Sequence, residues 1–102
     1  KAMQSPMNSC VKALRNGAVV EANTVTKLTK KNCRTNAGKA VKVRGKSLLT
    51  RGDAAGAFRV YKQKGVWKLK TYGSKANVRV IWSAPGNADY TAYKQTRAYK
   101  IR

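Results

Sequence analysis

Hydrophobic and polar residues alternate along most of the chain that follows Gly17. This period of two predicts β-strands, because neighbouring side chains on a strand point to opposite faces of a sheet. The turn at Gln63, Lys64 and Gly65 fits a hairpin between two of the strands. Glycine, proline and asparagine separate the alternating segments, which cover residues 18–25, 41–49, 58–64, 67–71, 78–82 and 91–101.

The spacing of these segments predicts an all-β fold. Five or six short strands, separated by turn residues about every 8 to 12 positions, are typical of a small antiparallel β-sandwich. The number of strands does not distinguish a sandwich from a barrel. A five- or six-stranded β-barrel of the oligonucleotide-binding type is therefore the alternative.

The first residues follow a different pattern. Residues 1–9 are expected to form a mobile arm, and residues 10–102 a single domain. Four apolar residues at helical spacing also fit a short helix, with Ser5 as its N-cap, Pro6 at its first position and Gly17 at its end. These four residues are Met7, Cys10, Val11 and Leu14. They would pack on the core, because so short a helix is unstable by itself.

Composition adds a strong positive charge to this picture. The 102 residues include 23 Lys and Arg but three acids, which are Glu21, Asp53 and Asp89, so the formal net charge is +20. Hydrophobic residues make up 42% of the chain, which favours a folded domain over a disordered one. Because charge of one sign destabilises a compact state, the composition indicates a polyanion as the partner. The candidates are nucleic acid, anionic lipid, wall teichoic acid and acidic glycan.

Strand alternation also places basic side chains on the sheet faces that point away from the core. Six are predicted as anion-binding residues: Lys42, Arg44, Arg59, Lys68, Lys70 and Arg79. A single lysine of this kind is typical of any solvated strand face, but such faces usually mix basic and acidic residues. The scarcity of acids favours polyanion binding by the surface as a whole, with an affinity that falls steeply with salt.

Aromatic residues lie among the basic ones. Trp67 and Trp82 share the apolar phase of their strands, so both are expected in the core. Three tyrosines are expected as exposed contacts at the binding surface: Tyr61, Tyr72 and Tyr93. Ile81 would join them at an interface if it were exposed.

Two cysteines, Cys10 and Cys33, allow one intramolecular disulfide. A closed loop of this size stabilises the folded state by about 3 kcal/mol in the chain-entropy model, and we expect the bond to form. The alternative is two separately buried thiols, as a cytosolic basic protein would carry.

The residue inventory argues against catalysis. Histidine is absent, which removes the usual general base near neutral pH, and the few acids and cysteines provide no metal-ligand set. We therefore expect no enzymatic activity, no metal and no cofactor.

Two short motifs are not expected to be functional. The adhesion tripeptide Arg-Gly-Asp at residues 51–53 lies where a turn is expected. Lys46 and Ser47 are adjacent on a strand and point to opposite faces, so they form no Ser-Lys dyad.

Several segments of the C-terminal two-thirds resemble a known class of domain. They are residues 35–43 (TNAGKAVKV), 50–53 (TRGD), 70–73 (KTYG), 78–93 (VRVIWSAPGNADYTAY) and 97–101 (RAYKI). Over residues 34–102 the chain resembles the small secreted immunoglobulin-like β-sandwich domains of Gram-positive, mainly actinobacterial, surface and exported proteins. The resemblance implies an immunoglobulin-like sandwich outside the cell, where a disulfide would persist. It carries no catalytic signature and assigns no residue a role.

Three functions fit these features. The favoured one is a secreted, noncatalytic antimicrobial protein of bacteriocin or killer-toxin character, which binds the anionic polymers or lipids of bacterial envelopes. The alternatives are a module that only docks on cell-wall polymer and a basic nucleic-acid-binding domain. The chain starts at Lys1 without an apolar leader segment, so for a secreted protein the signal peptide is expected to have been removed already. We expect a monomer.

Overall fold

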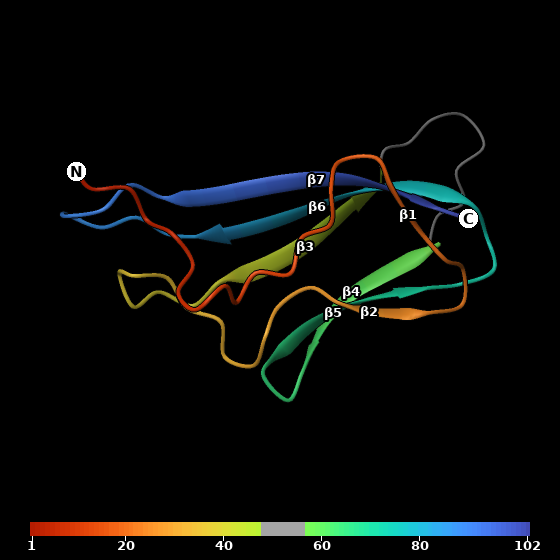
Figure 1. Cartoon of the computed structure of the whole chain (residues 1–102), viewed down its shortest axis with the longest axis horizontal. Coiled ribbons are helices and arrows are strands. Elements are labelled where there is room, and N and C mark those ends of the chain that lie inside the picture. The colour runs from red at the N-terminus through yellow and green to blue at the C-terminus, as the bar shows by residue number, and fades with distance from the viewer. Residues whose placement is uncertain (48–56) are drawn as a thin grey trace.

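A computed structural model describes residues 1–47 and 57–102 of the chain. This part of the chain contains no helix and seven strands: β1 (Ala18–Val20), β2 (Val25–Lys27), β3 (Lys42–Ser47), β4 (Phe58–Gln63), β5 (Val66–Thr71), β6 (Ala76–Ala84) and β7 (Tyr93–Ile101). They form a four-stranded sheet in the order β1-β7-β6-β3 and a three-stranded sheet in the order β2-β5-β4, which lie one above the other (Figure 1). The expected β-sandwich is confirmed. The barrel alternative is wrong, because the described strands form two separate sheets.

The order of strands β2 to β7 is the one found in an immunoglobulin constant-type sandwich. In that fold the second, fifth and fourth strands share one sheet with the first strand, and the third, sixth and seventh form the other. Here β2 to β7 are divided in the same way, but β1 lies in the sheet of β7 instead of beside β2. The first strand, β1, lies parallel to β7, whereas the other strand pairs of the described residues are antiparallel. In antibody domains a disulfide joins the two sheets, but here Cys10 and Cys33 lie outside the strands.

The hairpin between β4 and β5 has the expected turn. Gln63 pairs with Val66, so Lys64 and Gly65 form a two-residue loop. Their φ angles are 50° and 80°, which is the left-handed conformation that a type I′ hairpin turn requires. The sequence prediction of this hairpin is confirmed.

The expected first strand, residues 18–25, is wrong as a single element. It is divided between β1 in the large sheet and β2 in the small sheet. Between them Asn23 has a φ of 58°, and the Thr24 hydroxyl donates to the Glu21 carbonyl over 2.7 Å. This turn carries the chain from one sheet to the other. Asn23 is the signal of this turn in the sequence, but neither glycine nor proline accompanies it, so the predicted strand was continued through it.

The expected short helix before Gly17 is also wrong. Met7 and Leu14, which were placed on its apolar face, are 49% and 44% exposed. Residues 10–12 instead run antiparallel to residues 28–30 and exchange backbone hydrogen bonds with them. This extended pairing satisfies the backbone groups that a helix would have satisfied internally.

Residues 1–9, expected as an arm, lie against loops of the sandwich at the end where Figure 1 marks the N-terminus. Gln4 is 5% exposed. Its side-chain amide donates to the carbonyls of Pro85 and Thr91 over 2.9 Å each. Its oxygen accepts a hydrogen bond from the Thr35 hydroxyl. Gln4 thus links the N-terminal segment to two loops that are far apart in the sequence, the one before β3 and the one between β6 and β7.

The core lies between the two sheets. Trp82 is fully buried, and its indole N–H donates to the Leu28 carbonyl over 2.9 Å. Trp67 packs against the same cluster from a partly buried position. Both tryptophans therefore lie where the sequence placed them. At one edge of the sandwich β3 approaches β4 closely, since a Cβ atom at Gly45 would lie 2.7 Å from Val60 Cγ2.

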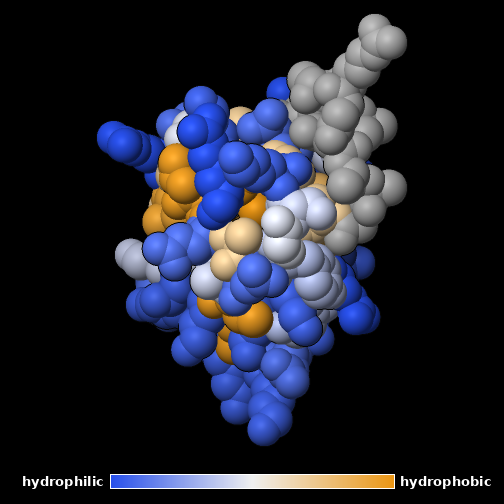
Figure 2. Space-filling model, turned by 90° about the vertical axis from the view of Figure 1, so that its right-hand side faces the viewer, coloured by the Kyte–Doolittle hydropathy of each residue, from blue (hydrophilic) through white to orange (hydrophobic). Residues whose placement is uncertain are grey.

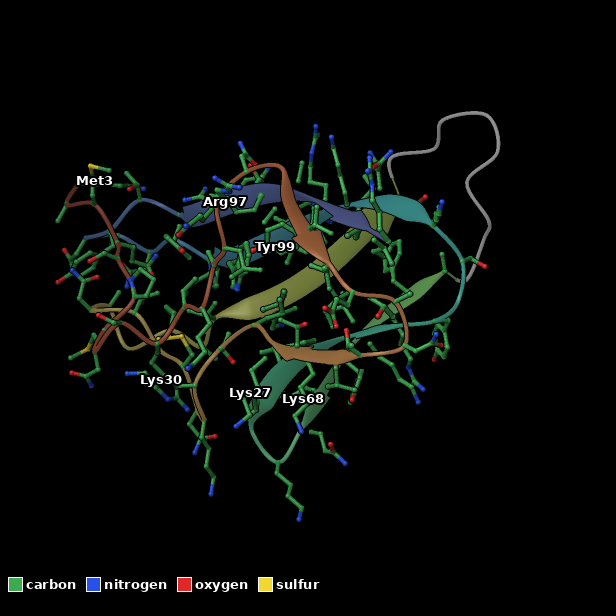
Figure 3. All side chains as sticks on the ribbon, turned by 45° about the vertical axis from the view of Figure 1, so that its right-hand side comes forward. Met3, Lys27, Lys30, Lys68, Arg97 and Tyr99 are labelled. Atoms are coloured by element: carbon green, nitrogen blue, oxygen red, sulfur yellow. A yellow bond between two sulfur atoms is a disulfide. The ribbon has the colours of Figure 1, made fainter. Side chains whose placement is uncertain are left out.

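Cys10 and Cys33 are joined by a disulfide, with their Cα atoms 5.3 Å apart. The bond, yellow in Figure 3, ties the N-terminal segment to the loop that precedes β3. Both β1 and β2 lie within the closed loop. The predicted pairing is confirmed, and the alternative of two separate thiols is wrong.

Candidate polyanion-binding faces

The outer side of the four-stranded sheet carries six exposed basic side chains. Side chains that are paired across neighbouring strands share a face of the sheet. The strand register therefore shows which basic side chains lie on this outer side. Lys46 lies directly opposite Arg79, and Lys42 and Lys94 flank Ser83. The large-sheet face, as we name it, consists of Lys42, Arg44, Lys46, Arg79, Lys94 and Lys100.

Ile81 lies in the middle of the large-sheet face. Its neighbours across the strands are Arg44 on β3 and Thr96 on β7. It is only 5% exposed, yet it does not belong to the cluster packed between the sheets. The alkyl stems of long basic side chains cover apolar surface in this way while their charges stay in water. Ile81 is therefore unavailable as an exposed interface contact.

The outer side of the three-stranded sheet forms a second basic surface. Lys27 lies directly opposite Lys68, and Arg59 directly opposite Lys70. Figure 3 shows Lys27 and Lys68 side by side, pointing away from the large sheet. The small-sheet face, as we name it, consists of Lys27, Arg59, Lys68 and Lys70 together with Tyr61.

Two tyrosines lie beside basic residues of the small-sheet face. The Arg59 guanidinium carbon lies 5.6 Å from the centre of the Tyr61 ring. The Lys70 ammonium lies 5.5 Å from the centre of the Tyr72 ring, which follows β5 and is 38% exposed. These distances fit cation–π contacts. Val25, which is paired with Lys70, is 52% exposed and adds an apolar contact to this face.

Tyr93, the third predicted contact, lies on neither outer face. It packs, partly buried, against the core cluster. Burial raises the pKa of its phenol above the usual 10.0, although the charge of Arg97 opposes this change. Burial also raises the pKa of Tyr99, while a hydrogen bond from the Leu14 N–H, 2.8 Å long, and the charge of Arg97 act in the opposite direction. Both phenols therefore stay protonated at neutral pH.

Like charges face one another directly on both surfaces. The opposed pairs are Lys27 with Lys68, Arg59 with Lys70, and Lys46 with Arg79. Such directly opposed like charges destabilise a sheet. Among the described residues the carboxylate side chains belong to Glu21 and Asp89, and both lie outside the strands. The described strands therefore offer no carboxylate to neutralise these pairs, and an external anion can do so.

The six predicted anion-binding residues do not form one surface. Lys42, Arg44 and Arg79 lie on the large-sheet face, whereas Arg59, Lys68 and Lys70 lie on the small-sheet face. Sequence reasoning missed four further members: Lys27, Lys46, Lys94 and Lys100. Alternation over residues 91–101 could have found two of them, because it turns residues 94 and 100 to one side of the strand and residues 93, 99 and 101 to the other.

A third basic region borders a hollow of about 400 Å³ beside the disulfide. Its lining includes Lys30, Lys31 and Arg34. Two of these cations are held by backbone carbonyls: the Lys30 ammonium donates to Asn8, and Arg34 Nη1 to Gly38, over 3.1 Å each. This hollow lies outside the two strand faces.

Two weaker sequence signals can also be placed. The Arg-Gly-Asp tripeptide, residues 51–53, lies outside the described residues. Lys46 lies on the outer face of the large sheet, while the neighbouring Ser47 belongs to the inward row that contains Val78 and Tyr99. The two side chains thus point to opposite sides of β3, as expected.

Apolar side chains are scattered on the end of the sandwich seen in Figure 2, where orange patches are separated by hydrophilic residues. In the described ranges, 1–47 and 57–102, no helix is long and apolar enough to cross a membrane. The same ranges contain no group of three or more His, Cys, Asp and Glu residues that could hold a metal ion.

Comparisons with models of protein families, with curated proteins and with solved structures find no match to this chain.

Proposed function

We propose that this chain is a secreted, noncatalytic antimicrobial protein that binds the anionic envelopes of bacteria through the outer faces of its two sheets. The observation that carries the proposal is the set of like-charged pairs that face one another on both surfaces. Each such pair opposes folding by about 0.2 to 1 kcal/mol. When the protein binds a densely anionic surface, the anions neutralise this repulsion. The relief of repulsion strengthens the binding.

The disulfide supports a location outside the cytosol. Disulfides persist in secreted and surface proteins and are rare in the reducing cytosol. The Cys10–Cys33 bond is therefore compatible with export. It favours an envelope as the partner over the intracellular nucleic acid that a basic protein of this size would otherwise suggest.

The chemistry of the chain supports a binding role without turnover. Histidine is absent from the sequence. The pKa values of Tyr93 and Tyr99 are raised by burial, which moves these phenols further from neutral pH. General acid–base catalysis needs a group that exchanges protons near the working pH. We therefore propose that growth inhibition depends on the amount of protein bound to the cell surface.

The small-sheet face supports an envelope in a second way. Tyrosine has an apolar ring and a polar tip, and such residues are enriched where one side of a contact is apolar and the other is wet. The small-sheet face combines apolar and charged groups in this way, since its basic residues lie beside Tyr61, Tyr72 and Val25. In this proposal, electrostatic binding brings these side chains into the headgroup region of a membrane.

A pair of charge-matched variants tests the proposal. Lys42→Gln, Lys46→Gln, Lys68→Gln and Lys70→Gln together remove two charges from each face, and Lys1→Gln, Lys12→Gln, Lys31→Gln and Lys75→Gln together remove four charges outside the strands. A basic residue near an anionic surface contributes about 1 kcal/mol, so the face variant should bind vesicles of anionic lipid roughly thirtyfold more weakly. The control variant should lose far less. Growth inhibition of Gram-positive strains should decline in the same order.

Three outcomes would contradict the proposal. Equal losses in both variants would show that net charge alone determines binding. Envelope binding without growth inhibition would favour a docking module for wall polymer. Tight binding to DNA or RNA with no binding to vesicles or isolated walls would favour the nucleic-acid alternative.

A further inference from the structure

The two basic faces lie on opposite sides of the molecule. Each is the outer side of one sheet of the sandwich, so the core separates them. In Figure 3 the side chains of Lys27 and Lys68 extend from the small sheet, away from the large sheet above it. A flat surface that contacts one face therefore leaves the other face exposed to solvent.

The faces are far enough apart to act independently in physiological salt. Stacked sheets lie about 10 Å apart, and the basic side chains extend outward from both of them. The Debye length at this ionic strength is about 8 Å, so charge bound at one face is largely screened at the other. Neutralisation of one face does not remove the attraction at the opposite one.

Each face carries a substantial array by itself. The large-sheet face contributes six basic side chains and the small-sheet face four. Along a strand such residues recur about every 6.6 Å, and neighbouring strands are about 4.8 Å apart. The backbone hydrogen bonds of each sheet hold this spacing, so little conformational entropy is lost when a flat anionic surface binds.

We infer that one molecule binds two anionic phospholipid surfaces at the same time and thereby cross-links them. This inference rests on the proposed function, because it requires that each face can bind an envelope. A lipid surface suits the geometry, since each array is broad, and the small-sheet face adds tyrosines and Val25 to its charges. Bridging of this kind adheres membranes to one another without a pore and without turnover.

Bridging by two faces depends on the ratio of protein to lipid. At low protein-to-lipid ratios a bound molecule finds a bare surface for its free face, and membranes adhere. At high ratios every surface is already coated, so free faces meet coated membranes and adhesion falls. The dose dependence of adhesion should therefore pass through a maximum, whereas binding should saturate.

Three variants that lose the same number of charges test this inference. The first has Lys27, Lys68 and Lys70 replaced by Gln, and the second has Lys42, Lys46 and Lys94 replaced by Gln. The control has Lys1, Lys31 and Lys75 replaced by Gln, at positions outside both sheets. Vesicles of phosphatidylglycerol and phosphatidylcholine serve as the probe. Co-sedimentation measures binding, and energy transfer between two separately labelled vesicle populations measures adhesion.

The expected result separates binding from bridging. Each lysine removed from a face should weaken the hold of that face on anionic lipid about fivefold, so three removals weaken it roughly a hundredfold. Both face variants should still bind through their intact face, within about threefold of the natural chain, but should lose most of the adhesion. The control should bind and cross-link like the natural chain. A mixture of the two face variants should not restore adhesion.

Other results would overturn the inference. Adhesion by the single-face variants equal to that of the control would show that bridging depends on net charge alone. Restoration by the mixture would show that association between copies, and not two faces of one molecule, links the vesicles. Binding of the natural chain without adhesion at any ratio would exclude bridging but leave the proposed function intact. Absence of binding would contradict the proposed function itself.

Discussion

Lys68 illustrates how stability and binding oppose each other at single residues. It lies directly opposite Lys27 on β2 and opposite Tyr61 on β4. Its ammonium donates to Gln63 Oε1 over 3.1 Å. This hydrogen bond orients the charge without neutralising it, so Lys68 still repels Lys27. The residue adds positive charge to the small-sheet face at the expense of sheet stability.

Replacement of Lys68 by Glu should therefore stabilise the fold while it weakens binding. The substitution changes a like-charge pair with Lys27 into an opposite-charge pair, and we expect the free energy of unfolding to rise by about 0.5 kcal/mol at low salt. Urea unfolding checks this value, and the gain should shrink at high salt, where charges are screened. Lys31→Glu, outside the strands, is the control for net charge. A loss of stability specific to Lys68→Glu would contradict the repulsion argument.

At the scale of elements, the sequence predicted the strands from β3 onward better than those before it. The segments that became β4 to β7 alternate over five or more residues, and a glycine turn or the proline at residue 85 separates most of them. By contrast, β1 and β2 have three residues each. Residues 1–12 pair with segments far along the chain. Local patterns do not encode such distant partners.

The residues of the candidate site were predictable in part, but their arrangement was not. Alternation identified six of the ten basic side chains that form the two faces. It did not reveal that Arg44 and Arg59, only fifteen positions apart, lie on opposite outer faces. That division arises because β3 and β4 belong to different sheets. It depends on the tertiary packing of the sandwich, which a one-dimensional pattern does not contain.

The disulfide should contribute much of the stability of the N-terminal third. The pair Cys10→Ala with Cys33→Ala opens the loop that holds β1 and β2, and we expect a loss of about 3 kcal/mol in the free energy of unfolding. Urea unfolding measures the loss, and the reduced natural chain should behave like the variant. Hydrogen exchange should increase most in residues 10–30. Equal stability of the oxidised chain and the variant would contradict this role.

For the whole molecule, the arrangement of charge is as informative as its amount. A net charge of +20 on 102 residues predicts attraction to any polyanion. The sandwich divides part of this charge into two fixed arrays. Other described basic residues lie on loops, at the end beside the disulfide, and at Lys62 on β4 and Arg97 on β7, which belong to neither array. The proposed function requires that the arrays, more than the scattered charges, contact the envelope.

The salt dependence of binding to anionic vesicles tests this claim most directly. Each contact releases counterions, so the logarithm of the binding constant should fall linearly with the logarithm of salt concentration between about 50 and 200 mM. The variant with Lys42, Lys46, Lys68 and Lys70 replaced by Gln should have a shallower slope, because two contacts are missing from each face. The variant with Lys1, Lys12, Lys31 and Lys75 replaced by Gln should keep the slope of the natural chain. Equal slopes for all three proteins, or binding that does not change with salt, would contradict the account.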